Sequence, residues 1–122
     1  MIKLAIGATA IMLLMFSGAI GEEMALTGVG TSSCSEVLRY YSKANPAGVQ
    51  LVFFSWAQGF MAGWNVGLAD QKDLKIDLSM MNDDDQKKYL REYCDQHPMK
   101  KYVDGVVALM GQIKHARTKD PN

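Results

Sequence analysis

The sequence predicts a small all-α domain, a bundle of about four helices around a central apolar helix, stapled by one disulfide bond. Three observations support this prediction. Residues 48–68 contain no charged residue, and the stretch is too long for a strand. On both sides of it, apolar residues recur at the helical spacings of three and four. The chain also contains only two cysteines, Cys34 and Cys94, and these allow one intrachain bridge.

The N-terminus has the order of a secretory signal peptide. Lys3 precedes an apolar run, residues 4–16, which is followed by small residues. We predict that residues 1–21 are a signal peptide, cleaved after Ala19 or Gly21; the alternative is an uncleaved membrane anchor. The predicted location is therefore periplasmic or secreted, with no membrane association after cleavage.

Export changes the expected chemistry of the cysteines. In an oxidising compartment, an even pair is first interpreted as a disulfide. A Cys34–Cys94 bond would close a loop of roughly 60 residues and stabilise the fold by about 4 kcal/mol in the chain-entropy model.

Local signals then set the first helical boundaries. Residues 22–33 contain two glycines and no helical period, and we predict a loose, flexible leader. Ser33 and Glu36 match a capping box at the start of a short helix. The pair Asn45-Pro46 ends that helix, since the residue before proline avoids the helical region, and Pro46 suits the first turn of the next one.

Two interpretations of residues 48–68 stay open, a membrane span and a core helix packed on nearly all sides. Several polar side chains within the stretch would be costly against lipid unless paired, which favours the core helix. Gly59, Gly63 and Gly67 fall four apart and line one face. In a soluble protein we expect this face to let a neighbouring helix approach closely, at roughly 1 kcal/mol of helix propensity per glycine.

The remaining elements complete the domain, residues 34–117. Residues 70–81 are predicted to be a loop that places three apolar side chains, Leu74, Ile76 and Leu78, on the core. Asn82 is a good N-cap for a third helix. A fourth helix is predicted from about Met99 to Arg117, followed by a frayed polar tail, residues 118–122. Its expected inward face comprises Met99, Tyr102, Val103, Val106, Leu109, Met110 and Ile113.

No catalytic, metal or cofactor site is predicted. The two histidines, His97 and His115, are interpreted as helix-end residues. Cys94 and His97 have the spacing of half a zinc site, but no second pair of ligands follows. Lys3 is the only charged residue in the signal, so the mature chain has 12 of the 13 basic residues against 13 acidic ones. Without a basic patch, nucleic-acid binding is not expected, and we expect a non-enzymatic protein that binds other proteins.

The placed helices resemble the HdeA-type small periplasmic proteins. Cys34 and Leu38 match that family's Cys-x-x-x-Leu, and Pro46-Ala47 precedes a long apolar helix as in the family. Tyr102 follows Cys94 by eight positions and begins a segment, residues 102–106, that is similar to the family's final helix.

The HdeA resemblance implies an acid-stress chaperone, a dimer at neutral pH that dissociates in acid and covers denatured clients with its apolar surface. Protonated carboxylates would lose native ion pairs, while the disulfide would keep the opened chain compact. The residues that would contact clients or the second subunit lie on the central helix. They are Phe53, Phe54, Trp56, Phe60, Met61 and Trp64.

A second resemblance is to the Rap/Tai-type immunity proteins of type VI secretion. Residues 59–63 resemble their Gly-Tyr-x-x-Gly segment, and Tyr89-Leu90 with His97-Pro98 resembles their Tyr-Leu…His-Pro helix end. This resemblance implies one cognate toxin, bound at neutral pH without dependence on acid. A structural periplasmic protein with an unidentified partner is the third possibility.

Overall fold

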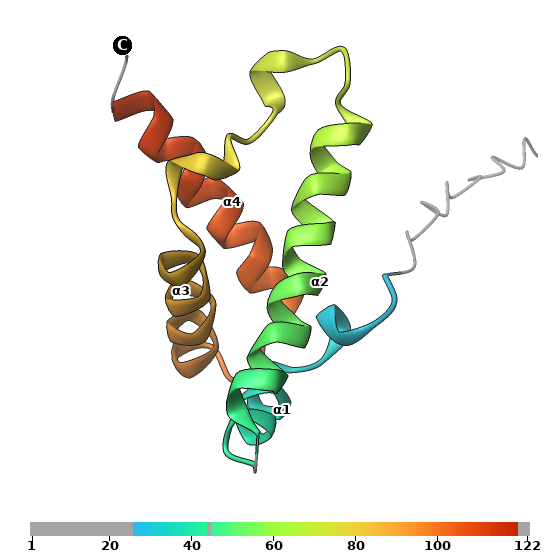
Figure 1. Ribbon diagram of the computed structural model, residues 1–122, viewed down its shortest axis with the longest axis vertical. Coiled ribbons are helices and arrows are strands. Elements are labelled where there is room, and N and C mark those ends of the chain that lie inside the picture. Colours follow the sequence, from blue (N-terminus) through green and yellow to red (C-terminus); the bar gives the residue numbers. More distant parts are fainter. Residues whose placement is uncertain (1–25, 44, 120–122) are drawn as a thin grey trace, which may run out of the picture.

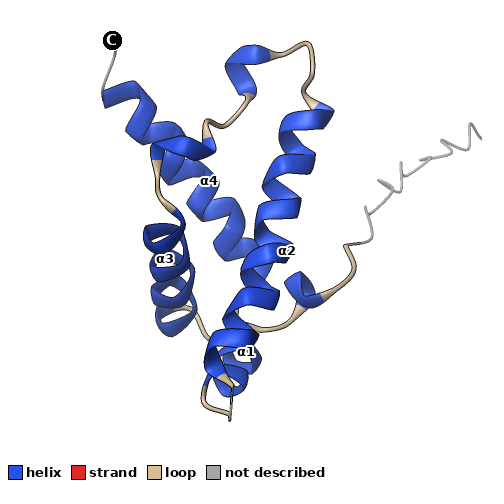
Figure 2. Ribbon diagram, viewed as in Figure 1, coloured by secondary structure: helices blue, strands red, loops and turns tan. Residues whose placement is uncertain are grey.

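The computed structural model describes residues 26–43 and 45–119, with side chains to residue 114. The predicted signal peptide, residues 22–25 of the leader and residues 120–122 of the tail lie outside these ranges. The described part is all-α, as predicted, and has no strand (Figure 2). Its four α-helices are α1 (Cys34–Tyr41), α2 (Pro46–Gly67), α3 (Asp83–Gln96) and α4 (Tyr102–Lys119).

The helices form an open arrangement around α2. At one end of the molecule α2 lies close to α1 and to the start of α4, and toward the other end α2 and α4 diverge (Figure 1). The segment between α2 and α3 crosses the gap between them. Helix α3 packs along α4, because Gly105 has no side chain and leaves room for the ring of Tyr93.

The disulfide is present and joins α1 to α3. Cys34 and Cys94 have their Cα atoms 4.7 Å apart, and both side chains are buried. Around the bond, buried side chains from all four helices form one core. Its largest fully buried members are Tyr102, Met61, Leu90, Leu109 and Ile113.

The predicted starts of the first three helices are confirmed by their hydrogen bonds. The hydroxyl of Ser33 accepts from the backbone N–H of Glu36, while the carboxylate of Glu36 accepts from the N–H of Ser33 at 3.0 Å. The side chain of Asn45 caps α2 and that of Asn82 caps α3. These contacts satisfy N–H groups that a helix leaves without a partner in its first turn.

The end of the leader, residues 26–33, is packed and not loose, which corrects that part of the prediction. Trp56 on α2 donates its ring N–H to the carbonyl of Thr27 at 3.2 Å, and the N–H of Tyr102 donates to the carbonyl of Ser32 at 2.9 Å. A short 3₁₀ turn, Val29–Thr31, lies between them. Gly30 is buried directly against the Trp56 ring, and this close contact orders the segment. A search for helical periodicity in the sequence does not reveal such a contact.

We expect Gly30→Ala to destabilise the protein by about 1–3 kcal/mol, because a Cβ at this position would overlap the ring of Trp56. Urea unfolding followed by circular dichroism measures the change. Gly111→Ala is the control, since a Cβ there meets nothing within 4 Å and alanine adds helix propensity. Equal stability of Gly30→Ala and the parent chain would show that residues 26–31 are not held as described.

Helix α4 begins at Tyr102, three residues later than predicted, and Met99 is 90% exposed instead of facing the core. The cause is the start of α1. The N–H groups of Cys34 and Ser35, which have no partner within α1, donate to the carbonyls of Lys100 (2.7 Å) and Pro98 (3.0 Å). These bonds hold the connection between α3 and α4 in a non-helical turn.

The segment between α2 and α3 is a loop with two 3₁₀ turns, Lys72–Leu74 and Leu78–Met80. Of its three predicted core side chains, Ile76 is buried and Leu78 is partly buried against the core, as expected. Leu74 is 44% exposed and does not reach the core.

Candidate functional site

Helix α2 is covered on one side only, which corrects the prediction that it is packed on nearly all sides. Leu51, Val52 and Val66 are 62%, 55% and 75% exposed. They lie on an uncharged strip that runs along the helix, which we call the open face of α2 and which consists of Leu51, Val52, Ser55, Gly59, Ala62, Gly63, Val66 and Gly67. All eight residues are exposed.

No neighbouring helix approaches the glycines of α2. A Cβ placed at Gly59, Gly63 or Gly67 would have no other atom within 4 Å, so the expected close contact is absent. The three glycines lower the helix propensity of α2 without packing against any residue that the structure describes. The helix propensity lost at these glycines is therefore not offset by a packing contact within the described fold.

A groove of about 620 Å³ adjoins the open face. Its lining is apolar and uncharged, with Phe60, Trp64 and Leu68 on α2 and Leu26 from the N-terminal segment beside the three glycines. Trp64 also borders a second apolar hollow of about 190 Å³, where Val107 and Met110 of α4 contribute. The half-exposed indole of Trp64 thus separates two apolar depressions at the end where α2 and α4 diverge.

The structure divides the six predicted contact residues into three groups. Phe53, Phe54 and Met61 belong to the core and are at most 4% exposed, so they offer no surface to a partner. Phe53, for example, contacts the Tyr102 ring edge-on at 5.1 Å between centroids. Trp56 and Phe60 are partly buried and stack on each other, and of the six only Trp64 is exposed, by about half of its surface (49%).

The other exposed large apolar residues of the open face and the groove were missed, namely Leu26, Leu51, Val52 and Val66. A helical projection of residues 46–67 places the last three on the same side as the glycines, but α2 is apolar on all sides, so the projection does not indicate which side is covered. When the covered side of the helix is not known, choosing contact residues by their aromatic character picks out core residues instead of surface residues.

Asn65 ties the loop to α2. Its amide donates to the carbonyl of Ile76 and its side-chain oxygen accepts from the N–H of Ile76, both at 2.8 Å. This pairing satisfies the side chain of Asn65, one of the polar groups of residues 48–68 that would be costly against lipid unless paired. It also fixes the buried Ile76 under the loop. We call these two hydrogen bonds the Asn65 latch. Because Ile76 lines the hollow beside Trp64, the latch holds one wall of that hollow.

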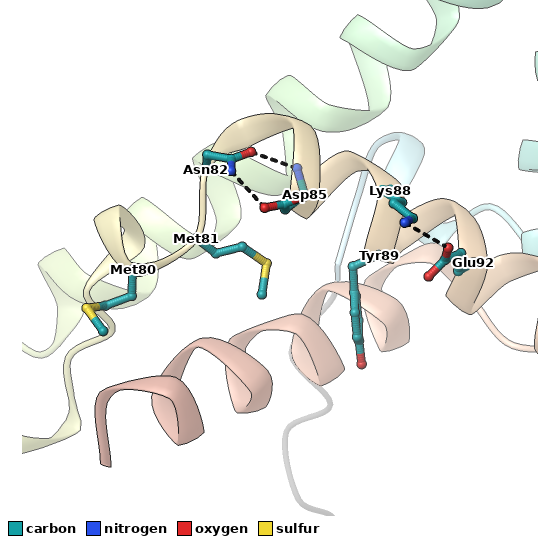
Figure 3. Close-up of a pocket in the computed structure, with 7 residues that line it drawn as sticks. All are labelled: Met80, Met81, Asn82, Asp85, Lys88, Tyr89 and Glu92. Carbon is teal, nitrogen blue, oxygen red and sulfur yellow. Dashed lines mark hydrogen bonds and ion pairs between the residues drawn. The ribbon is translucent and has the colours of Figure 1, made fainter. Parts of the chain in front are cut away.

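A polar depression of about 380 Å³ lies along α3 and the preceding turn (Figure 3). Its polar side chains pair with one another: the Asn82 amide donates to Asp85 at 2.7 Å, and the Lys88 ammonium lies 3.9 Å from the Glu92 carboxylate. Met80, Met81 and Tyr89 complete the lining. Because Asp85 serves the cap of α3, the arrangement is that of a helix start and shows no nucleophile beside a base.

The residues suspected of metal binding have structural roles. Cys94 is consumed by the disulfide, and the ring of His97 lies 4.6 Å from that of Tyr93, at the end of α3. Within residues 26–43 and 45–114, whose side chains are described, no group of three potential ligands could hold a metal ion. The side chain of His115 lies outside that part of the chain.

Burial raises the pKa of the Tyr102 and Tyr41 hydroxyls, which both lie in the core, Tyr102 more strongly. The pKa of Glu36 is lowered, chiefly by the backbone N–H of Ser33 and next by its hydroxyl. Both effects belong to the fold and not to a reaction site.

Among the described helices, none is long and apolar enough to cross a membrane. Comparison with known proteins gives no match, whether to a family model, a curated protein or a solved structure.

Proposed function

We propose that the protein is a non-enzymatic binding protein of the periplasm or cell exterior, an acid-stress chaperone of the HdeA type. The observation that supports this proposal is the uncharged open face of α2 with its adjoining groove. Interface cores are depleted of charge, and contiguous apolar surface on a small domain marks interaction sites. The disulfide agrees with an oxidising compartment.

A chaperone for unfolded clients needs apolar contact without strict shape or charge selection. The groove offers this, since its lining is glycine, aromatic and aliphatic and contains no charged side chain. A cognate toxin would instead be expected to meet charged groups that select one partner. The open face therefore favours the chaperone over the immunity protein.

Acid would act mainly at the start of α1. The three ion pairs found in the described part of the chain are on the surface, where such pairs contribute little. At the cap of α1 the carboxylate of Glu36 accepts from the N–H of Ser33, and this bond lowers the pKa of Glu36. Protonation of Glu36 would weaken this contact at the first turn of α1.

Glu36 supplies a testable part of this pH dependence. Because its folded pKa is lowered, its contribution is present above its ordinary value of 4.5 and is lost as the pH falls through the lower folded value. We expect Glu36→Gln, whose amide oxygen still accepts a bond but does not titrate, to flatten the loss of stability below that value. Urea unfolding at a series of acidic pH values measures the difference; parallel curves for both proteins would contradict it.

The function is tested by client aggregation at about pH 2–3 and at neutral pH, with and without the oxidised protein. We expect suppression in acid only. Trp64→Ser should weaken it, while the control Met99→Ser removes an exposed apolar side chain away from the open face and should not. No suppression at either pH would overturn the chaperone proposal, and capture of a single cognate toxin at neutral pH would then establish the immunity alternative.

A further inference from the structure

We infer that the end of the molecule where α2 and α4 diverge binds one molecule of a fatty-acid anion. Its carboxylate would lie beside Lys114, and its acyl chain would run through the hollow beside Trp64 and into the groove. The ligand is a small molecule, so the inference does not rest on the chaperone proposal and is tested by a different measurement.

The hollow beside Trp64 is formed by three separate elements of the fold. Its large apolar side chains are Trp64 from α2, Leu74 and Ile76 from the loop, and Val107 and Met110 from α4. Figure 1 shows that this loop crosses the gap between the two helices. Sites for small molecules are typically concave, mostly apolar and formed in advance. The hollow has these properties, since the Asn65 latch fixes Ile76 and the side chain of Met110 is buried.

Three apolar side chains of the hollow remain about half exposed in the fold. Trp64 is 49% exposed, Leu74 is 44% exposed and Val107 is 55% exposed. A single exposed apolar residue is ordinary on a protein surface, but several that converge on one depression indicate a binding site. A chain of methylene groups in the hollow would remove these three side chains from water, and this burial would supply most of the binding free energy.

One charged group lies at the hollow, and it is a cation. Lys114 belongs to the lining of the hollow, which contains no acidic residue, and the lining of the groove contains no charged residue at all. Among the residues whose side chains are described, none forms an ion pair with Lys114. A lysine can lay its methylene stem along apolar surface while its ammonium stays in water. The site therefore matches an amphiphile that has an apolar body and one anionic head group.

The two depressions together favour an elongated ligand. The hollow has a volume of about 190 Å³ and the groove about 620 Å³, and Trp64 lines both. A chain that continues from the hollow past the half-exposed indole meets Phe60, Leu68 and Leu26 instead of water. This apolar surface is recessed and suits a single acyl chain, whereas a bilayer binds apolar side chains that project into it.

The first test is calorimetric titration with straight-chain carboxylates at neutral pH, below their micelle concentrations. The chain is expressed in full and the form that the cell releases is purified oxidised. We expect one site for decanoate, with affinity that rises about two- to fourfold for each methylene group from hexanoate to decanoate. Decanol, which has the same chain without the charge, should bind more weakly.

A charge reversal isolates the head group. We expect Lys114→Glu to lower the affinity for decanoate at least about fivefold and to leave decanol binding unchanged. Lys100→Glu is the matched control, because Lys100 is also exposed, lies just before the opposite end of α4 and is absent from both linings. Equal effects of the two variants, or equal affinity of the parent for decanoate and decanol, would overturn the place assigned to the carboxylate.

A matched pair of valines locates the acyl chain. Val107 and Val52 are both 55% exposed on helices, but only Val107 lines the hollow. We expect Val107→Ser to weaken decanoate binding at least about threefold, while Val52→Ser leaves it unchanged. The inference is overturned if decanoate shows no saturable binding, or if the two serine variants behave alike. Binding to vesicles of phosphatidylcholine and phosphatidylglycerol without binding of monomeric decanoate would also overturn it, in favour of a membrane surface.

Discussion

Removing the Cys34–Cys94 bond is expected to lower the free energy of unfolding by about 4 kcal/mol, the largest effect of any single change considered for this protein. The bond joins positions 60 residues apart and therefore excludes many conformations of the unfolded chain. It is also fully buried between α1 and α3, so both sulfur atoms contribute to packing.

The double variant Cys34→Ala/Cys94→Ala measures this effect without leaving a free thiol. Its unfolding midpoint in urea is compared with that of the oxidised parent, and the parent with added reductant serves as the second measurement. A loss below about 1 kcal/mol would mean that the core alone holds α1 on α3, against the expectation for a domain of this size.

Asn65→Leu is expected to destabilise by about 2–3 kcal/mol. Leucine has a similar volume but cannot pair with the N–H and carbonyl of Ile76, and these two part-buried groups would lose their partners. Gln58→Leu is the matched control on the same helix, because Gln58 makes one long contact, 3.4 Å to Asp83, which is exposed. Equal losses in the two variants, measured by urea unfolding, would show that the latch does not carry the loop.

The local elements of the fold could be predicted because their signals are short-range. Ser33, Asn45 and Asn82 mark helix starts through bonds made within three residues, and two cysteines allow one intrachain pairing. The limits of α2 followed from the loss of charge and from Pro46.

The coverage of α2 could not be predicted in the same way. Its sequence is apolar on all sides, so no periodicity indicates which side meets α4. The glycines that suggested a buried contact lie instead on the open face, while Gly30 and Gly105, which lie against Trp56 and Tyr93, are not marked by any local pattern. The core positions of Phe53 and Met61 and the exposure of Val66 depend on long-range packing, which local signals do not encode.

The position of the disulfide also determines how the molecule would carry mechanical load. A force that separates the two chain ends would pass from Ser33 through the sulfur atoms to Asp95, because the bond connects the first residue of α1 to α3. Helices α1 and α2 and most of α3 lie inside the closed ring and would bear no tension. An unfoldase or a translocating motor could then unravel α4 and residues 26–33. It would have to move the covalently closed ring, which contains α2, as one unit that cannot be extended.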